Sequence, residues 1–257
     1  MTPTIGFIYP DHAAEDDYPR AAVILGVDLR VAHIYGTDLH AVPELLDLGS
    51  PARLRDGAAL LAGYTPSAVV WACTSGSFVY GPDGAREQVR GLAEAAGVPA
   101  SSTSFAFVNA ARAIGVTRVA VCASYPDDVA RLFVNFLAAE GIQVLSMSSA
   151  GIDTAAEVGT LSPEQVLELA VANDHPEAQA LLIPDTAMHT LEVLPKLEAA
   201  LGKPVLTANQ VTIWEGLRLA GYAPDTAAPP GAATPDSVIE PSGLGKLLSE
   251  RLIHVGH

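Results

Sequence analysis

The sequence predicts an α/β fold made of two pseudosymmetric halves, each built around a parallel sheet. Three observations predict it. Short apolar stretches alternate with Ala-, Leu- and Glu-rich stretches from the N-terminus to about residue 220, an alternation typical of βαβ units. The same order of stretches occurs twice along the chain, and the first strand of each half is followed by the same three residues, Tyr-Pro-Asp, at or just after its end.

The predicted strands are short runs of mostly apolar residues bounded by Gly, Pro, Asn, Asp or Ser, which is the usual signature of strands. Their continuous apolar character indicates burial on both faces, as in parallel sheets covered by helices on both sides. The seven predicted strands are residues 4–10, 29–36, 68–74, 118–124, 142–149, 180–186 and 203–209.

An internal repeat divides the chain. Residues 69–115 match residues 181–221, because each stretch reads strand, polar turn, helix, Gly-x-Pro, short strand and a helix that ends in Arg-x-x-Gly. We therefore expect two Rossmann-like (flavodoxin-like) halves, 1–113 and 114–220. Residues 221–257 are rich in Pro and Ala and predict a crossing segment followed by a short terminal helix.

The 257-residue chain is strongly acidic, with a formal net charge of −15. A surface of this charge repels phosphates, so we expect neither a nucleic acid nor an anionic membrane as a partner. No apolar run approaches the ~18 residues that a membrane span needs, and the N-terminus lacks the basic start of a signal peptide. These features predict a cytoplasmic protein.

The two cysteines, Cys73 and Cys122, are too few for a disulfide framework and lack the spacing of a metal site. The seven histidines form no metal-binding motif either, so we expect no metal. Cys122 falls in the middle of a predicted strand, where a cysteine usually packs as a small apolar side chain.

Cys73 and Asp185 occupy matching places in the two halves, each at the end of a predicted strand. Ligands of parallel sheets bind at the carboxyl ends of strands, so we expect both side chains to flank one cleft. The loop and helix after Cys73 predict a thiolate, because N–H dipoles favour it; the alternative is a cysteine that only packs. Asp185 is a candidate general acid–base group or the cap of the next helix.

Thr74, Ser75, Gly76 and Ser77 offer hydroxyl and N–H groups that suit a carboxylate or an enediolate, although such runs are also ordinary turns. Tyr125 ends a strand of the second half, so its hydroxyl is a candidate donor to a substrate carboxylate, or its ring fills the interface between the halves. The other candidate substrate-binding residues are His12, Thr186 and Ala187.

These stretches together resemble the aspartate/glutamate racemase superfamily, and within it the maleate cis-trans isomerase and arylmalonate decarboxylase branch. The resemblance spans about residues 4–221 and rests on motifs such as WACTSGS, ASYPDD and IPDT. It implies a metal- and cofactor-independent enzyme with its active site between the two halves, and a small carboxylate as substrate. We also expect a homo-oligomer.

By this resemblance, Cys73 matches the first-half cysteine, which is implicated as the nucleophile in maleate isomerases. Thr74, Ser75 and Tyr125 match positions that hold a substrate carboxylate. Asp185 stands where members with two cysteines have their second one, so a symmetric two-thiol racemase is not expected. The decarboxylase branch also has one cysteine but keeps the one in the second half, whereas this chain keeps the one in the first half.

Three hypotheses follow. In the first, Cys73 adds to or deprotonates a small dicarboxylate while Asp185 serves as partner acid or base, which gives isomerisation or racemisation. In the second, residues 74–77 and Tyr125 stabilise an enediolate formed by loss of CO₂ from a malonate-like acid, and Cys73 delivers the proton. In the third, the chain binds carboxylates without catalysing a reaction.

Overall fold

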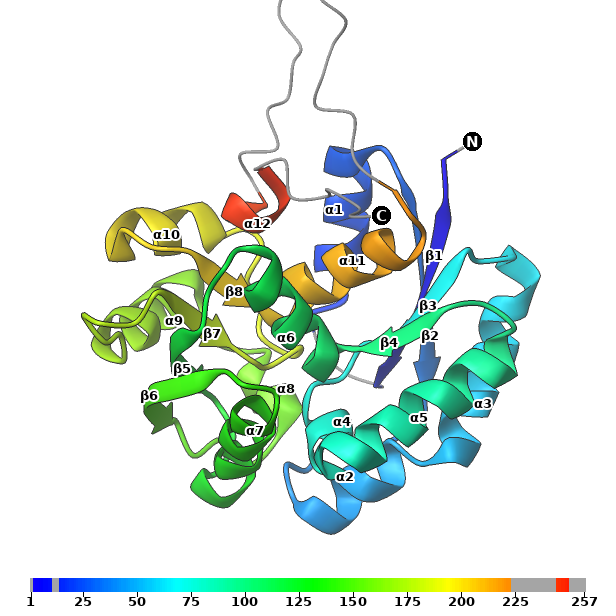
Figure 1. Cartoon of the computed structure of the whole chain (residues 1–257), viewed down its shortest axis with the longest axis horizontal. Helices are drawn as coiled ribbons and strands as arrows, with labels where there is room; N and C mark the ends of the chain where they lie inside the picture. Colours follow the sequence, from blue (N-terminus) through cyan, green and yellow to red (C-terminus); the bar gives the residue numbers. More distant parts are fainter. Residues whose placement is uncertain (1, 11–13, 223–243, 250–257) are drawn as a thin grey trace, which may run out of the picture.

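The computed structural model describes residues 2–10, 14–222 and 244–249, and these form two parallel sheets flanked by helices (Figure 1). In the first sheet the strands lie in the order β2-β1-β3-β4, and in the second in the order β6-β5-β7-β8. In each sheet, the second strand along the chain lies at one edge and is followed in space by the first, the third and the fourth. The predicted α/β fold with two similar parallel sheets is therefore confirmed.

The first sheet is built from β1 (Thr4–Pro10), β2 (Asp28–Ile34), β3 (Ala68–Trp71) and β4 (Ala100–Ser102). The second is built from β5 (Arg118–Ala123), β6 (Gln143–Ser149), β7 (Ala180–Ile183) and β8 (Val205–Thr207). Strands β4 and β8 are the short strands that the repeat predicts after each Gly-x-Pro.

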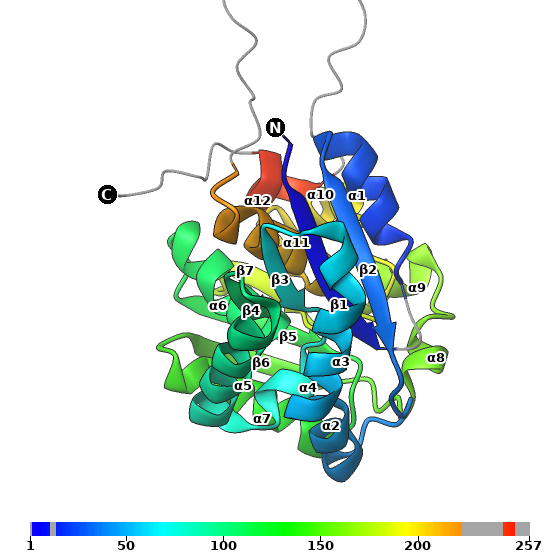
Figure 2. The ribbon, with the colours of Figure 1, turned by 90° about the vertical axis from the view of Figure 1, so that its right-hand side faces the viewer.

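The helices connect successive strands and cover both sheets (Figures 1 and 2). Those between residues 17 and 113 are α1 (Asp17–Leu25), α2 (Val42–Leu48), α3 (Pro51–Leu61), η1 (Ala62–Tyr64), α4 (Ser75–Phe78), α5 (Gly81–Ala96) and α6 (Thr103–Ala113). Those that follow are α7 (Asp127–Ala139), α8 (Ala155–Val158), α9 (Pro163–Ala172), α10 (Leu194–Leu201), α11 (Ala208–Leu219) and α12 (Gly245–Ser249).

Helix α11 joins the two halves. It follows β8 of the second sheet, yet Gly216 lies so close to the first sheet that an added Cβ would fall 2.5 Å from Ile5 Cγ2. The hydroxyls of Thr103 on α6 and Thr212 on α11 are 2.6 Å apart. Residues 208–217 of α11 are all buried. The helix therefore packs as a shared core element, although the repeat assigns it to the second half.

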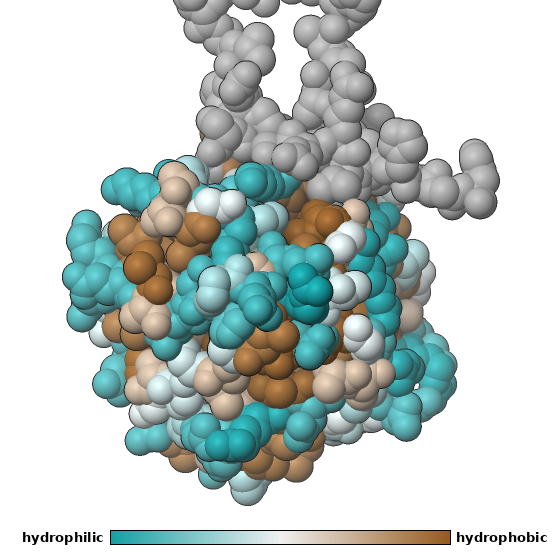
Figure 3. All heavy atoms as spheres, turned by 60° about the vertical axis from the view of Figure 1, so that its left-hand side comes forward, coloured by the Kyte–Doolittle hydropathy of each residue, from teal (hydrophilic) through white to brown (hydrophobic). Residues whose placement is uncertain are grey.

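The face shown in Figure 3 carries groups of apolar side chains between hydrophilic areas. Among the described residues, no helix is long and apolar enough to cross a bilayer. Of the predicted C-terminal part, residues 244–249 are described and contain α12, which lies within the predicted terminal helix. The crossing segment predicted after residue 221 falls mostly outside the described residues.

Candidate active site

A small cavity of about 30 Å³ lies among residues that follow strands of both sheets. Its volume is close to the share of a single water molecule in the liquid. The lining residues are Pro10, Thr37, Asp38, Leu39, His40, Leu45, Leu48, Cys73, Ser75, Ala155, Asp185, Thr186 and Ala187.

Cys73 reaches this cavity because β3 ends at Trp71 and the chain then turns into α4. Its thiol is 4% exposed. The Gly76 N–H donates to Sγ at 3.3 Å, and Ser75 Oγ lies 3.7 Å from Sγ. Burial raises the pKa of the thiol to about 11; the contacts with Gly76 and Ser75 lower it, and the Asp185 carboxylate raises it.

This balance corrects the expectation that the loop favours a thiolate. The N–H groups act on the Cys73 pKa in the predicted direction, but loss of solvation is the larger effect. At neutral pH the Cys73 side chain is therefore a thiol, and it can give a proton without first taking one. Cys122 also has its pKa raised by burial to about 11, and it does not line the cavity.

Asp185 lies two residues after the end of β7, as Cys73 lies two residues after the end of β3. Its Oδ1 accepts a hydrogen bond of 2.9 Å from the Ala187 N–H, and its Oδ2 accepts one from the Ser124 hydroxyl. The carboxylate is 3% exposed. One oxygen thus stabilises the following turn, as a cap would, while the other faces residues of the cavity.

Tyr125 fills the interface between the halves. Its ring packs against His40 and Phe78, with centroid distances of 4.9 and 5.8 Å. Its hydroxyl donates a hydrogen bond of 2.6 Å to the Pro184 carbonyl. The hydroxyl proton that we expected to bind a substrate carboxylate is therefore already used inside the protein. The alternative expectation, a ring that fills the interface, describes this arrangement; a contact with substrate stays a prediction.

Thr74 is fully buried, and its Oγ1 has no hydrogen-bond partner within the part of the chain that the structure describes. An unpaired buried hydroxyl is costly. Thr74 is not among the residues that line the cavity, so its contact with a substrate stays a prediction. Gly76 provides the N–H that faces Cys73. Ser77 is not brought to the cavity, since its hydroxyl donates to Ser102 at 2.8 Å inside the core.

The remaining candidate residues are Thr186 and Ala187 of the second half and His12 of the first. Thr186 and Ala187 line the cavity, and the Thr186 carbonyl accepts a hydrogen bond from the Asn209 amide at 3.2 Å. His12 lies outside the described residues. No group of three or more His, Cys, Asp or Glu side chains within residues 2–10, 14–222 and 244–249 is arranged to hold a metal ion.

Sequence reasoning missed His40, which belongs to the loop after β2. Its Nε2 lies 3.9 Å from Asp185 Oδ2, and its side chain is 5% exposed. The loop segment 37–40 pairs with residues 152–156 of the other half through Leu39 and Thr154. The signal available in the sequence was weak: a histidine four residues after the end of a predicted strand of a parallel sheet.

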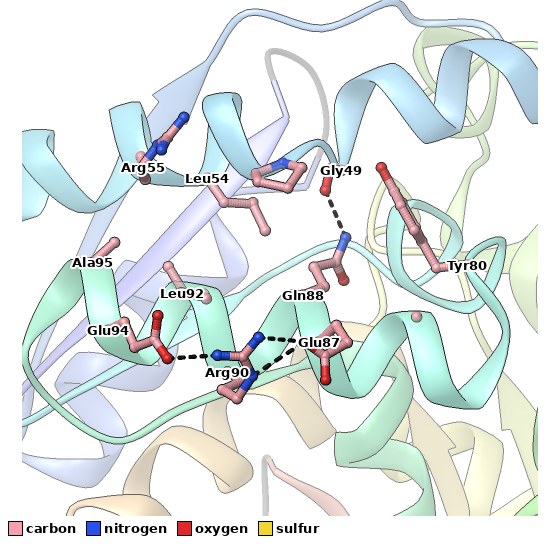
Figure 4. A pocket seen from close by; sticks show the side chains of 13 residues that line it. Gly49, Leu54, Arg55, Tyr80, Glu87, Gln88, Arg90, Leu92, Glu94 and Ala95 are labelled. Carbon is pink, nitrogen blue, oxygen red and sulfur yellow. Dashed lines mark hydrogen bonds and ion pairs between the residues drawn. The ribbon is translucent and has the colours of Figure 1, made fainter.

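A larger hollow of about 600 Å³ lies between α3 and α5 (Figure 4). Three of its four charged side chains pair with one another, since Arg90 binds both Glu87 and Glu94. Gln88 donates to the carbonyls of Gly49 and Gly76, both at 2.8 Å. We assign the candidate site to the smaller cavity, because that is where the thiol and the carboxylate of the two strand ends converge.

Known proteins resemble this chain in both sequence and fold. The family model for arylmalonate decarboxylase matches residues 49–231. The arylmalonate decarboxylase of Bordetella bronchiseptica is 30% identical over 231 residues, which cover 86% of this chain and 91% of that protein. A liganded mutant of arylmalonate decarboxylase, with one glycine changed to cysteine and one cysteine to serine, superposes with a TM-score of 0.79 and 26% identity, over 96% of this chain and 98% of that one.

A structure of Nocardia farcinica maleate cis-trans isomerase shares the fold, with a TM-score of 0.82 and 23% identity over 97% of this chain and 99% of that one. It is a cysteine-to-serine mutant that carries a covalently bound succinylcysteine intermediate. The family expected from the sequence motifs is thus confirmed: the family-model match and the 30% identity over most of both proteins show that this chain belongs to the arylmalonate decarboxylase family.

Proposed function

We propose that this protein is an enzyme that acts at the carbon next to a carboxylate of a small carboxylic acid, with Cys73 and Asp185 as its catalytic residues. One observation carries the proposal. The Cys73 thiol and the Asp185 carboxylate come from equivalent strand ends of the two sheets and line the same buried cavity. A substrate carbon held there would have a proton donor on one side and a proton acceptor on the other.

The polar groups beside Cys73 suit the intermediate of such a reaction. Removal of the α-proton or of CO₂ leaves an enediolate, whose two oxygens carry negative charge. The hydroxyl of Ser75, which lines the cavity, can donate to these oxygens. The Thr74 hydroxyl is a second proposed donor, for which the Tyr125 hydroxyl competes. Donors that are already in place stabilise developing charge without reorganisation.

In the isomerase or racemase reaction, Asp185 takes the α-proton: the C–H bond breaks, an O–H bond forms, and the electron pair stays on the substrate as the enediolate. Cys73 then gives its S–H proton to the carbon on the other face. For a maleate-like substrate, Asp185 instead takes the proton of Cys73 and the thiolate forms a C–S bond, while the C=C π bond breaks and its electron pair moves onto the adjacent carboxylate as an enediolate. Rotation about the new single bond, return of the electron pair to the double bond and loss of the thiolate then give the trans isomer. The covalent intermediate of the Nocardia isomerase supports this version.

Decarboxylation of an arylmalonate-like acid is the second candidate. In that reaction the bond to one carboxyl group breaks, CO₂ leaves, and the enediolate takes its proton from Cys73. Two observations favour it: the family-model match and the protonated state of the thiol that follows from its pKa of about 11. Because Cys73 would protonate from one side only, the product would have a single configuration.

The test is to incubate the wild type, Cys73→Ala and Cys122→Ala with maleate, aspartate, glutamate and phenylmalonate in D₂O. Proton NMR then reports products and exchange of the α-proton, and CO₂ release is measured in parallel. We expect conversion by the wild type and by Cys122→Ala, and a loss of at least ~100-fold in Cys73→Ala, the usual scale for a proton-transfer residue.

Each outcome decides between the hypotheses. CO₂ release from phenylmalonate would select decarboxylation, and interconversion of isomers or loss of the α-proton signal would select isomerisation or racemisation. Full activity of Cys73→Ala would overturn the role of the thiol. Carboxylate binding with no conversion of any of the four acids would favour the non-catalytic hypothesis.

We further propose a cytoplasmic homo-oligomer that needs no cofactor. The acidic chain, with its net charge of −15, supports a partner list without nucleic acid or anionic membranes. Light scattering coupled to gel filtration measures the oligomeric state. Turnover that is unchanged after dialysis against a chelator supports the absence of a required metal.

A further inference from the structure

His40 and Asp185 form a buried pair that joins the two halves. His40 comes from the loop between β2 and α2, and Asp185 from the loop after β7. Their nearest nitrogen and oxygen atoms, Nε2 and Oδ2, are 3.9 Å apart. The residues are 7% and 3% exposed, so water screens their interaction far less than it screens a surface pair.

The contacts of the His40 ring determine which nitrogen carries the permanent proton. Its Nδ1 lies 3.0 Å from the carbonyl oxygen of Ile152. A carbonyl oxygen only accepts hydrogen bonds, so Nδ1 must be the donor. In the neutral ring Nε2 is then unprotonated, and this is the nitrogen that faces Asp185. A change of protonation of His40 therefore takes place at the atom nearest the carboxylate.

Other ionisable side chains surround this pair. The ionisable side chains that face it from other described elements are Cys73, Tyr125 and Tyr9. Burial raises the pKa of all three, to about 11 for Cys73 and well above 10 for the tyrosines, so they are uncharged at neutral pH. On the segment of His40 itself, Asp38 also lines the cavity, and its Oδ1 accepts a hydrogen bond of 2.8 Å from the Ala156 N–H.

We propose that His40 is a positioning residue that shares one proton with Asp185 and thereby sets the charge of that carboxylate beside Cys73. The inference rests on the proposed function. When Asp185 takes the substrate α-proton, Nε2 and Oδ2 close from 3.9 Å to hydrogen-bond distance, the new O–H bond breaks and an N–H bond forms at Nε2 of His40. When product leaves, Nε2 returns its proton to solvent, and the Cys73 thiolate takes one from solvent, which restores the starting state.

Two substitutions distinguish proton exchange at Nε2 from a purely structural role, in which His40 only holds its loop in place through the bond from Nδ1 to Ile152. Asn in place of His40 keeps an N–H donor close to the position of Nδ1, and so keeps the bond to Ile152, but it has no group at Nε2. The backbone bond from the His40 N–H to the Asp153 carbonyl, 2.7 Å long, is present in either case. His40→Gln does the reverse, since its amide nitrogen lies close to the position of Nε2 but does not titrate.

The first experiment needs no substrate. Ring ¹⁵N NMR of the wild type and of Asp185→Asn, with His40→Gln to assign the signals, reports the protonation of each nitrogen. His175 is the internal control, because its Nδ1 accepts a hydrogen bond from the Glu177 N–H and has the opposite tautomer. We expect the His40 signals to change in Asp185→Asn while those of His175 stay. Unchanged His40 signals would overturn the proposal even if no substrate is ever found.

The second experiment uses the substrate identified by the NMR screen. We expect His40→Asn and His40→Gln to lower kcat by about 10- to 100-fold, the lower part of the range for proton transfer, with KM changed less than about twofold. One limb of the pH profile of kcat should also disappear. A loss that appears only in KM, or a wild-type pH profile in both variants, would overturn the proposal. His175→Asn should behave as wild type.

Discussion

The backbone N–H of Gly76 donates a hydrogen bond of 3.3 Å to the sulfur of Cys73. This contact ties the first turn of α4 to the thiol, and it lowers the Cys73 pKa against the larger opposite effect of burial. The chemistry of the thiol and the packing of Gly76 can therefore each be tested on their own, without a substrate.

Alkylation of Cys73 should be slow at neutral pH and should rise about tenfold per pH unit up to about pH 11. The reason is that the thiolate is the reacting form and burial raises the Cys73 pKa to about 11. The measurement is the rate of iodoacetamide labelling in Cys122→Ala, in which Cys73 is the remaining thiol, with glutathione as a control for the reagent. A rate that levels off below pH 8 would show instead that the thiolate forms readily.

Gly76→Ala should destabilise the protein by about 1–3 kcal/mol, the usual cost of overpacking a core. An added Cβ would lie 2.9 Å from Trp71 Cζ2 and 3.2 Å from Cys73 Sγ, and both residues are buried. Urea denaturation measures the change. Gly91→Ala in α5 is the matched control, since a Cβ there meets nothing within 4 Å and should be neutral or stabilising. Equal stability of the two variants would contradict the tight contact.

Asp17→Asn should remove part of the pH dependence of stability between about pH 4 and 6. Burial raises the Asp17 pKa from 3.8 to about 6, against the Asn209 amide and the N–H groups of Thr190 and Leu191, which lower it. The folded state thus holds this proton more tightly than the unfolded state. Its contribution to stability is complete below about pH 4 and is lost as the pH rises through 6, with a slope of up to ~1.4 kcal/mol per pH unit.

Urea denaturation of the wild type and of Asp17→Asn from pH 4 to 7.5 checks this prediction. The difference in unfolding free energy between them should shift in favour of the variant as the pH rises. Asp56→Asn, at an exposed position of α3, should run parallel to the wild type. A difference that is constant with pH, or that shifts in favour of the wild type, would be contrary to the sign derived for a raised pKa.

A disulfide between Leu39→Cys and Thr154→Cys should block turnover. Ligand sites usually measure hundreds of Å³, whereas this cavity measures about 30 Å³, so segment 37–40 must separate from residues 152–156 before a substrate enters. Residues 39 and 154 form a narrow antiparallel pair, because residues on either side make the backbone bonds, and such pairs accommodate a disulfide.

The oxidised double variant should lose at least ~90% of its activity and regain it on reduction. A loss of this size exceeds the effect expected of the two substitutions alone. Leu39→Cys by itself should respond to neither treatment. Full activity of the oxidised form would mean that substrate enters by another route.

Most of the fold could be predicted from the sequence, because it depends on local patterns. The alternation of strands and helices and the internal repeat place β1 to β8 in order, and the strand ends after β3 and β7 follow from them. Cys73 and Asp185 were therefore found without a structure. Strand β4 (Ala100–Ser102) has no apolar pattern of its own and was predicted through its counterpart β8 in the repeat.

The remaining features depend on contacts between distant parts of the chain. His40 reaches Asp185, Tyr125 donates to Pro184, and α11 packs on the first sheet, and no local pattern indicates these partners. The charge state of Cys73 was also decided by the tertiary structure. Local sequence places residues at the strand ends and sets which N–H groups follow them. Burial outweighs those N–H groups because the solvation of the thiol depends on every element packed around it.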